Sequence, residues 1–359
     1  MQSAKELFQN AVSLLKLLIA TPSFSKEEDK TAAIIKNHLN ELGIEVELSG
    51  NNIIAKNKYF TERKPTILLN SHHDTVKPNP NYTLNPFEPI EKEGKLFGLG
   101  SNDAGGCLVS LVAAFVHFYN QENLPYNIML VASAEEEISG YNGIEAAVKV
   151  LPPIDFAIVG EPTLLQMAVA ERGLMVLDVT TQGKAGHAAR NEGENAISKA
   201  IKEIAWFHQH QFSKVSPLLG PNKMSVTVIE TENKAHNVVP ALCKYVVDVR
   251  VNELYSFEEV LLEINQNISS EVKPRSLRLK STSISLEHPI VKAGMEMNKE
   301  FYGSPTTSDK ALMPFPALKM GPGDSARSHT ADEFIFLKEI EQGISDYIEI
   351  LERLKIMNS

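Results

Sequence analysis

Short, continuously apolar runs alternate with helical patterns through the first half of the chain. The runs cover residues 66–69, 127–132 and 156–159, and their length suits strands that are buried on both faces. Helical patterns separate them at 105–119 and 141–150. Because strands and helices that alternate in this way pack in layers, the chain is predicted to form an α/β fold in which helices cover a mostly parallel sheet.

A further helix is predicted ahead of these runs. Ser25 and Glu28 have the three-residue spacing of a capping box, and Gly43 has the position of a residue that ends a helix. Apolar residues recur between them at helical spacing, at Ile34, Ile35, Leu39 and Leu42. The sequence therefore predicts a helix that begins after Ser25 and ends at Gly43.

The pattern changes near Gly173. The elements predicted from there are strand 173–182, helix 194–211, strands 223–231 and 241–251, helix 256–267 and strand 274–283. Their order is β-α-β-β-α-β, which is typical of a ferredoxin-like fold. The prediction is therefore a larger domain made of residues 1–172 and 284–359, interrupted by an inserted domain of residues 173–283.

Composition restricts the partners and the metal ligands. A chain of 359 residues suits about two domains, and a net charge of -10 argues against a nucleic-acid surface. No signal peptide or membrane span is recognisable, and Cys107 and Cys243 form no disulfide framework, so a cytoplasmic protein that acts on small molecules is expected. Any metal site must then use histidine, aspartate and glutamate.

The apolar run 66–69 leads directly into two histidines and an aspartate. In an extended segment, His72 and Asp74 share one side while His73 points to the other. Such a pair is more often an ordinary polar strand end than a metal ligand. A metal site therefore needs support from the ends of other strands.

Carboxylates and a histidine stand at several such places. Asp103 precedes a helix, Glu161 follows the run 156–159, and His329 lies in a Gly/Pro-rich loop that begins at Gly321. Three successive glutamates, 135–137, follow another run, where like charges are unfavourable without a cation. Ligands collect at the carboxyl ends of parallel strands, so these groups together predict a metal site, and histidines with carboxylates suit zinc.

These segments, in this order and over nearly the whole chain, resemble the di-zinc amidohydrolase family. It includes acetylornithine deacetylases, succinyl-diaminopimelate desuccinylases, aminoacylases, glutamate carboxypeptidases and carnosine-type dipeptidases. The matching motifs are His-x-Asp-Thr-Val at 72–76, a glycine-flanked aspartate at Asp103, the acidic motif at 135–143, Gly-Glu-Pro-Thr at 160–163 and Gly-Pro-Gly-Asp…His at 321–329. The family often has Met-Lys after its aspartate, whereas this chain has Ala104.

The resemblance assigns roles to these residues. It implies that two Zn²⁺ ions bind, with Co²⁺ or Mn²⁺ as substitutes, and that the peptide bond after Asp103 is cis. One zinc would be held by His72, Asp103 and Glu161, and the other by Asp103, Glu137 and His329. Asp74 would orient His72, and Glu136 would be the general base; the residues after Glu137 fit the family's ligand position better than those after Glu136 do.

The inserted domain has its own resemblances. The segment around His187 is similar to one whose histidine reaches the partner's active site in the family's dimers and stabilises the oxyanion, which implies a homodimer formed through this domain. Asn237 and Arg250 resemble residues that bind the substrate carboxylate. An ion pair between Arg250 and Asp248 is the alternative for that arginine.

The activity implied is removal of an acetyl or succinyl group from the amine of an amino acid such as ornithine or citrulline, in arginine biosynthesis. The substrate would be an N-acyl amino acid with a free carboxylate. A dipeptidase or carboxypeptidase, or a succinyl-diaminopimelate desuccinylase, would use the same metal pair and stays an alternative. A binding protein without turnover is a remote one, because every expected ligand and Glu136 are present.

Overall fold

The computed structural model describes residues 2–190 and 192–357. The chain forms two compact units, of which the second consists of Ala170–Ser283 and Gly303–Thr307. The sequence predicted an inserted domain of 173–283, so the unit begins three residues earlier and takes in a segment that was not predicted. That segment joins it because Arg172 donates its backbone N–H to Ser304 and accepts a hydrogen bond at its carbonyl oxygen from the Thr307 hydroxyl.

The first unit is built on a sheet of strands in the order β1-β2-β6-β3-β7-β17-β8. Pairing is parallel among the four central strands and antiparallel at both sides of them. The bounds in that order are Val46–Ser49, Asn52–Lys56, Asn127–Ser133, Thr66–His72, Phe156–Val159, Ala317–Lys319 and Met167–Glu171. Every residue of β3 and β6 is buried, as expected for strands covered on both faces.

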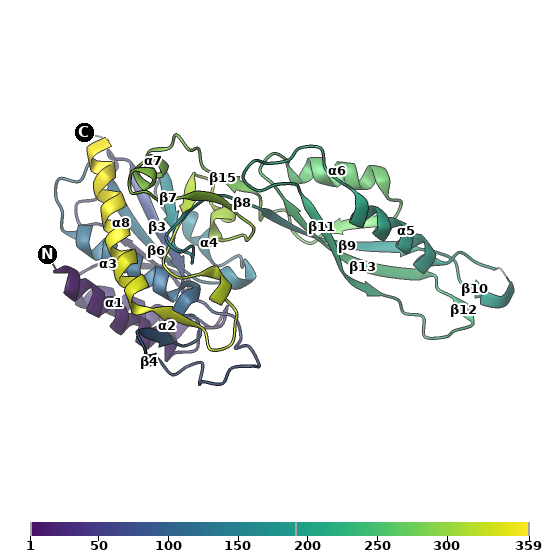
Figure 1. The fold of residues 1–359 in the computed structure, drawn as a ribbon, viewed down its shortest axis with the longest axis horizontal. Coiled ribbons are helices and arrows are strands. Elements are labelled where there is room, and N and C mark those ends of the chain that lie inside the picture. The colour runs from purple at the N-terminus through teal and green to yellow at the C-terminus, as the bar shows by residue number, and fades with distance from the viewer. Residues whose placement is uncertain (1, 191, 358–359) are drawn as a thin grey trace. The chain divides into compact units, whose positions relative to one another are not determined.

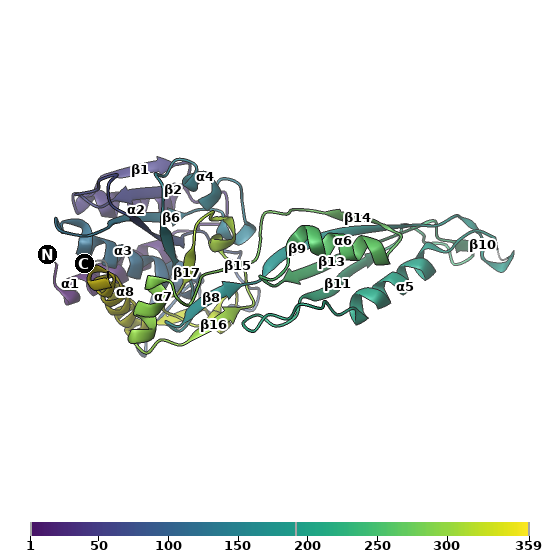
Figure 2. The same ribbon diagram turned by 90° about the horizontal axis from the view of Figure 1, so that it is seen from above.

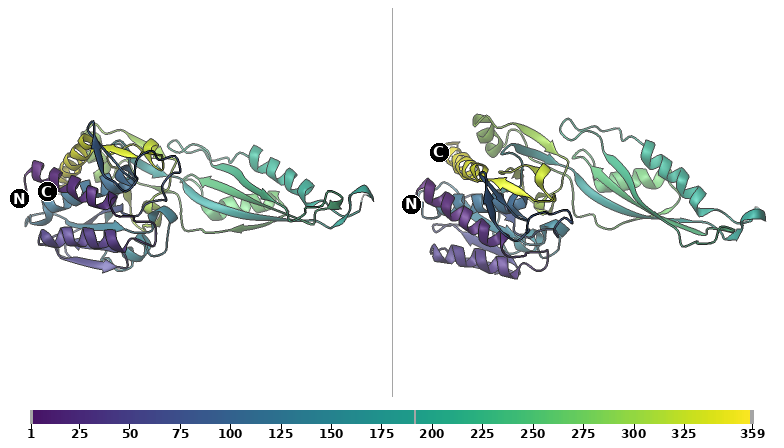
Figure 3. Two further views of the ribbon diagram at one scale, coloured as in Figure 1. Left: turned by 90° about the horizontal axis from the view of Figure 1, so that it is seen from below. Right: turned by 60° about the horizontal axis from the view of Figure 1, so that its bottom comes forward.

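Helices cover both faces of this sheet (Figure 1). The helices of the first unit are α1 (Ala4–Ile19), α2 (Asp29–Glu41), α3 (Gly106–Tyr119), α4 (Ile144–Val148), α7 (Pro289–Glu296) and α8 (Leu337–Met357). Helices α1 and α8 pack side by side and against α3, as the views in Figure 3 show. On the opposite face, α4 packs on apolar side chains of β3, β6 and β7. These layers confirm the predicted α/β architecture.

A small antiparallel sheet completes the first unit. Its order is β18-β5-β4, with β18 at Phe334–Phe336, β5 at Lys95–Phe97 and β4 at Ile90–Lys92. None of the helices in the described ranges is both long and apolar enough to cross a membrane.

The capping box predicted for α2 is wrong. The helix begins at Asp29 with Glu28 as its N-cap residue, and no side chain in the described part of the chain caps it. The Ser25 hydroxyl instead donates to the Asp74 carboxylate at 2.6 Å, because a hydrogen bond to a charged acceptor is stronger than the neutral one in which a capping hydroxyl accepts a backbone N–H. The predicted helix end is correct, and Gly43 follows with a φ of +73°.

The second unit is a four-stranded antiparallel sheet in the order β11-β13-β9-β14, with α5 and α6 packed on it (Figure 2). Its elements are β9 (Gly173–Gln182), α5 (Ala196–Gln209), β11 (Lys223–Glu230), β13 (Leu242–Val251), α6 (Phe257–Asn267) and β14 (Glu271–Pro274). Burial alternates along β9, because one face of an antiparallel sheet carries the core. The predicted β-α-β-β-α-β order is confirmed.

The last predicted strand of this unit, 274–283, is misplaced. β14 ends at Pro274, which has no N–H to continue a ladder. The N–H of Arg275 still donates to Val176 of β9 at 2.9 Å, but the ladder does not extend further, and Thr282–Ser283 forms a separate strand, β15, that pairs with β8. Beyond the paired ends of β9 and β13, two short strands, β10 (Gly186–His187) and β12 (Val238–Val239), form the tip of the unit.

Candidate metal centre

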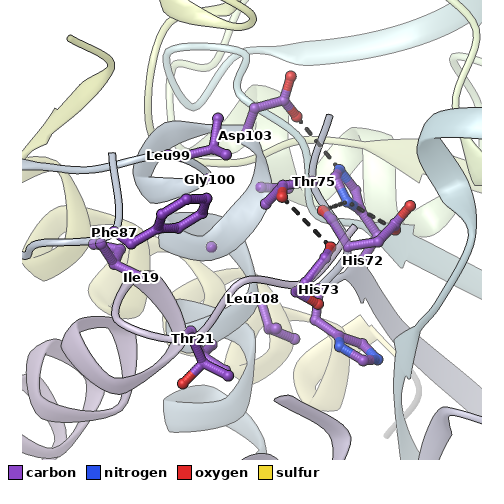
Figure 4. Close-up of a pocket in the computed structure, with 15 residues that line it drawn as sticks. Ile19, Thr21, His72, His73, Thr75, Phe87, Leu99, Gly100, Asp103 and Leu108 are labelled. Atoms are coloured by element: carbon purple, nitrogen blue, oxygen red, sulfur yellow. Dashed lines mark hydrogen bonds and ion pairs between the residues drawn. The ribbon is translucent and has the colours of Figure 1, made fainter. Parts of the chain in front are cut away.

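Polar side chains meet at the carboxyl edge of the parallel strands in the first unit. β3 ends at His72, β6 leads into the turn Glu136–Ile138, and β7 leads into Glu161. Asp103 comes from the turn Ser101–Gly105, which precedes α3. In Figure 4, Asp103 and His72 point toward one another.

The two oxygens of the Asp103 carboxylate face two different histidines. Oδ1 lies 3.3 Å from Nε2 of His72, and Oδ2 lies 3.6 Å from Nε2 of His329. The expected cis peptide bond is confirmed between Asp103 and Ala104. One carboxylate is therefore shared between two imidazoles, which is the arrangement that a carboxylate bridging two metal ions requires.

Three more carboxylates complete the cluster. Oε2 of Glu137 lies 3.0 Å from Nε2 of His329. Oε1 of Glu161 and Oε2 of Glu136 each lie 3.9 Å from Nε2 of His72. All five predicted metal ligands are thus in one cluster, and the predicted base Glu136 lies beside them.

The ligand atoms form two overlapping groups of three. One group is His72, Asp103 and Glu137, and the other is His72, Glu136 and Glu161; within each, the atoms lie within 4.8 Å of one another. Nitrogen and oxygen atoms of histidine and carboxylate are ligands that Zn²⁺ accepts. The donor set present therefore fits a pair of divalent cations.

The electrostatics of the cluster also favour cations. Burial raises the pKa of Glu136 well above its ordinary value; His72 opposes the shift, and the charge of Glu161 adds to it. Burial raises the pKa of Asp309 to about 7. The ionised form of these carboxylates is therefore unfavourable so close together and so little exposed, and a bound cation would stabilise it.

The three successive glutamates have different surroundings. Glu135 has a φ of +55°, and its carboxylate accepts hydrogen bonds from the backbone and side-chain N–H groups of Asn142 at 3.3 and 3.0 Å. It therefore faces a neighbouring loop. Glu136 faces His72 and Glu137 faces His329 instead. Glu135 therefore has a structural role, while Glu136 and Glu137 are placed to bind metal or transfer protons.

Asp74 contacts more than the histidine it was expected to orient. Nδ1 of His72 lies 3.0 Å from the backbone oxygen of Asp74 and 3.4 Å from its Oδ1. The carboxylate of Asp74 accepts the backbone N–H groups of Glu136 at 3.0 Å and Glu137 at 3.2 Å. Asp74 thus holds both the imidazole and the turn that carries the two glutamates, and the second contact was not predicted.

His73 points away from the cluster, as its position in the strand predicted (Figure 4). Its ring nitrogens make hydrogen bonds with the Thr31 hydroxyl at 2.9 Å and the Asn51 carbonyl at 3.0 Å. Burial lowers the pKa of His73. The neutral ring is therefore a satisfied core residue.

Two other contacts behind the cluster were also missed. The buried carboxylate of Asp309 accepts a hydrogen bond of 2.5 Å from the hydroxyl of Ser133, the last residue of β6. The buried carboxylate of Glu333 accepts backbone N–H groups of the turn that carries Asp103. The sequence has no signal for such contacts, because every residue except proline has a backbone N–H group.

In the second unit, His187 and Asn237 lie together at the tip. Both are exposed, and the N–H of Ala188 donates to the backbone oxygen of Asn237. Nδ1 of His187 accepts a hydrogen bond from the N–H of Ala189 at 3.2 Å. The histidine ring is therefore oriented but remains accessible.

Arg250 does not join them. It forms a two-pronged ion pair with Asp248, at 2.8 and 3.0 Å, which is the alternative considered from the sequence. Along β13, Arg250 is eight residues from Leu242, the residue at the tip end of the strand, or roughly 26 Å at about 3.3 Å per residue. Arg250 and Asn237 of one chain therefore lie at different ends of this sheet, and their part in binding a substrate carboxylate stays a prediction.

Comparisons with known proteins identify the family. The sequence pattern of peptidase family M20/M25/M40 matches residues 68–353. An M20 domain-containing protein of Schizosaccharomyces pombe is 28% identical over 96% of this chain and 85% of its own length. A succinyl-diaminopimelate desuccinylase of Cereibacter sphaeroides is 25% identical (95% and 94%), and an acetylornithine deacetylase of Buchnera aphidicola is 26% identical (94% and 97%).

Solved structures share the fold. An aminopeptidase of Bacillus cereus superposes with a TM-score of 0.77 at 17% identity, over 97% of this chain and 98% of its own. A Bacillus subtilis protein, described as a dinuclear metal-binding peptidase of the M20 family, gives 0.73 at 16% identity over 98% and 99%. The chain therefore belongs to peptidase family M20/M25/M40 and is a metallo-hydrolase of that family.

Proposed function

We propose that the chain removes an acetyl or succinyl group from the amine of an amino acid such as ornithine or citrulline. The observation that carries this proposal is the shared carboxylate of Asp103, whose two oxygens face His72 and His329. The names of full-length relatives, an acetylornithine deacetylase and succinyl-diaminopimelate desuccinylases, support the deacylase class. Ornithine or citrulline as product would place the reaction in arginine biosynthesis.

The proposal gives the cluster two zinc ions. His72, Asp103 and Glu161 would hold one ion, while Asp103, Glu137 and His329 would hold the other. Bound there, the ions would supply a Lewis acid for the amide oxygen and lower the pKa of water. Co²⁺ or Mn²⁺ could replace zinc, since both accept the same donor atoms.

Glu136 is the proposed general base. Its carboxylate is partly buried beside His72, and burial raises its pKa, which makes it a stronger base than an exposed glutamate. In the reaction, Glu136 takes a proton from the attacking water and returns it to the leaving amine as the amide C–N bond breaks. The products are a carboxylate and a free amine, and Glu136 ends in its starting state.

A desuccinylase that acts on succinyl-diaminopimelate is an equally supported second candidate, because several relatives carry that name. We would measure hydrolysis of N-acetyl and N-succinyl ornithine, citrulline and diaminopimelate, with two dipeptides, before and after removal of metal. Metal-dependent release of amine from an acyl-ornithine or acyl-citrulline is expected. Preference for a dipeptide would contradict a deacylase, and turnover that survives complete metal removal would contradict the metal mechanism.

The proposal includes a homodimer formed through the second unit. β11 is an edge strand of its sheet, and Val228 and Ile229 on it are 42% and 54% exposed. Ile201 on α5, the helix beside β11, is 56% exposed. Apolar side chains on an open strand edge favour pairing with another chain, and a second copy offers the same edge.

The proposed dimer interface can be tested by placing one charged side chain on β11. Ile229→Lys should shift the sedimentation of the protein from dimer toward monomer, because it places a charge on the edge strand. Val150→Lys is the matched control, since Val150 is 62% exposed in the first unit. A wild-type monomer, or equal effects of both changes, would contradict this interface.

A further inference from the structure

One buried carboxylate outside the ligand cluster binds the turn that carries Asp103. Glu333 is 2% exposed. Its Oε1 accepts the backbone N–H groups of Asn102 at 2.8 Å and Asp103 at 2.9 Å, and its Oε2 accepts that of Gly100 at 3.2 Å. The backbone oxygen of Glu333 accepts a fourth N–H, from Gly98, at 3.0 Å.

The turn needs an acceptor from elsewhere in the chain. Its residues directly precede α3, and N–H groups at the start of a helix have no partner within the helix. Buried N–H groups without a partner destabilise the fold. Gly100 has a φ of +73°, so the chain reverses there and presents three N–H groups to a single carboxylate.

The same design occurs on the other side of the cluster. Asp74 accepts the N–H groups of Glu136 and Glu137, and Glu333 accepts those of Asn102 and Asp103. The turn of Glu136 and Glu137 and the turn of Asp103 are thus each fixed through the backbone by a separate buried acid. Glu333 is also four residues after His329, so one segment supplies a histidine of the cluster and fixes the aspartate that the histidine faces.

We infer that Glu333 is a positioning residue of the metal centre: it fixes the Asp103 turn, sets the separation of the Asp103 carboxylate from both histidines, and so controls how tightly the metal pair is held. The inference rests on the proposed metal pair. It assigns Glu333 no contact with substrate or metal.

The variant that tests it is Glu333→Gln. Glutamine keeps the size of the side chain, but its NH₂ group would face an N–H donor, so at least one of the three hydrogen bonds is lost. Glu203→Gln is the matched control. Glu203 is 8% exposed in the second unit and accepts the N–H groups of Ser269 and Ser270 at 3.0 and 3.1 Å, far in sequence from every cluster residue.

The readout is metal release from the loaded full-length protein into an excess of a chromogenic chelator. Glu333→Gln should release metal about ten- to a hundredfold faster than the wild type, the range seen when residues that support metal ligands are changed. Glu203→Gln should lower the melting temperature but release metal at the wild-type rate. Wild-type release from Glu333→Gln, or equal acceleration in both variants, would overturn the inference.

A second measurement needs no variant. In the metal-free wild-type protein, the amides of Gly100, Asn102 and Asp103 should exchange with deuterium at least about tenfold more slowly than exposed loop amides, because Glu333 holds them without metal. Free exchange of these amides in the metal-free protein would overturn the inference. If the wild-type protein binds no metal, the proposed metal pair fails, and this exchange measurement still decides whether Glu333 fixes the turn.

Discussion

The two units arrange their candidate functional residues in opposite ways. At the carboxyl edge of the first unit, the ligand atoms form two groups of three, within each of which they lie within 4.8 Å of one another, and the His72 side chain is 1% exposed. In the second unit, His187 and Asn237 are exposed at the tip, and Arg250 lies at the far end of β13 in an ion pair. The first unit contains a formed site, and the second contributes separate groups.

Strand direction explains this difference. Parallel strands bring all their carboxyl ends to one edge, so residues that follow different strands converge there. In an antiparallel sheet, residues at the two ends of one strand are separated by its whole length. The topology of the first unit thus brings its functional residues together. Residues at opposite ends of the second unit's sheet would act together only through another molecule, such as substrate or a second chain.

The sharpest test of the formed site is Glu136→Gln. Turnover should fall by about 10²–10⁴-fold, because general-base catalysis contributes that much, while metal content stays near the wild-type value. Steady-state hydrolysis and metal analysis of the same preparation measure both quantities.

Neighbouring glutamates supply the controls. Glu135→Gln should leave turnover within a few-fold, since that side chain binds Asn142, and Glu137→Gln should lose metal as well as activity. Metal loss from Glu136→Gln with full metal in Glu137→Gln would exchange the two roles.

A second prediction tests whether the exposed tip serves the formed site of another chain. His187→Ala should lower turnover about 10²–10³-fold, the range for removal of one oxyanion donor, with little change in metal content. Mixed dimers of His187→Ala and Glu136→Gln subunits should recover activity, because one of their two sites would lack both groups and the other would lack neither. No recovery in verified mixed dimers would show that His187 acts within its own chain or does not act.

Much of the first unit could be predicted from the sequence because its signals are local. A buried parallel strand needs a continuous apolar run, and the polar residues that follow it must lie at the sheet edge; His72 and Glu161 were found in this way. The backbone contacts of Glu333 and Asp74 leave no such signal, since an N–H group belongs to every residue except proline. The Ser25 prediction was wrong for the same reason: its competing acceptor is distant in sequence.

The second unit was harder to predict at the level of function. The predicted strands 173–182 and 241–251 match β9 and β13, but the prediction of a strand contains no information about which strand ends come together. Asn237 and Arg250 were therefore paired by their resemblance to the family, and the antiparallel sheet separates them. The predicted strand 274–283 was wrong because Pro274 ends the ladder at a position where the residues beyond it still alternate.

A substitution of Arg250 tests, with a smaller expected effect, whether the second unit binds the substrate carboxylate. If it binds the substrate carboxylate, Arg250→Lys should lower kcat/KM by roughly ten- to a hundredfold, because lysine cannot make two parallel hydrogen bonds. Methyl esterification of the substrate should cause a similar loss, and the two losses should not add, since they remove one interaction.

Asp248→Asn is the matched change on the other side of the ion pair. It frees the guanidinium from Asp248 and should leave kcat/KM unchanged or higher. If Arg250→Lys and esterification are fully additive, and Asp248→Asn is as harmful as Arg250→Lys, the ion pair is structural and the second unit does not bind the carboxylate through Arg250.

The smallest expected effect compares the buried acids of the two units in the metal-free protein. Burial raises the pKa of Asp309 in the first unit to about 7. An acid whose pKa is higher in the folded state binds more protons there than in the unfolded state, so the stability it contributes is complete below the unfolded pKa and is lost as the pH rises through about 7. In the second unit, burial alone would raise the pKa of Glu203, but hydrogen bonds from Ser270 and Ser269 lower it overall. Its contribution is present above the unfolded pKa and is lost only in acid.

Between pH 6 and pH 8 the metal-free first unit should therefore lose stability, by an amount that lowers its melting temperature a few degrees, while the second unit should not. Amide hydrogen exchange measures this for each unit separately, in α3 for the first and in α5 for the second, after correction for the intrinsic pH dependence of exchange. Equal loss of protection in both helices, or a loss confined to α5, would contradict the opposite pKa shifts of Asp309 in the first unit and Glu203 in the second.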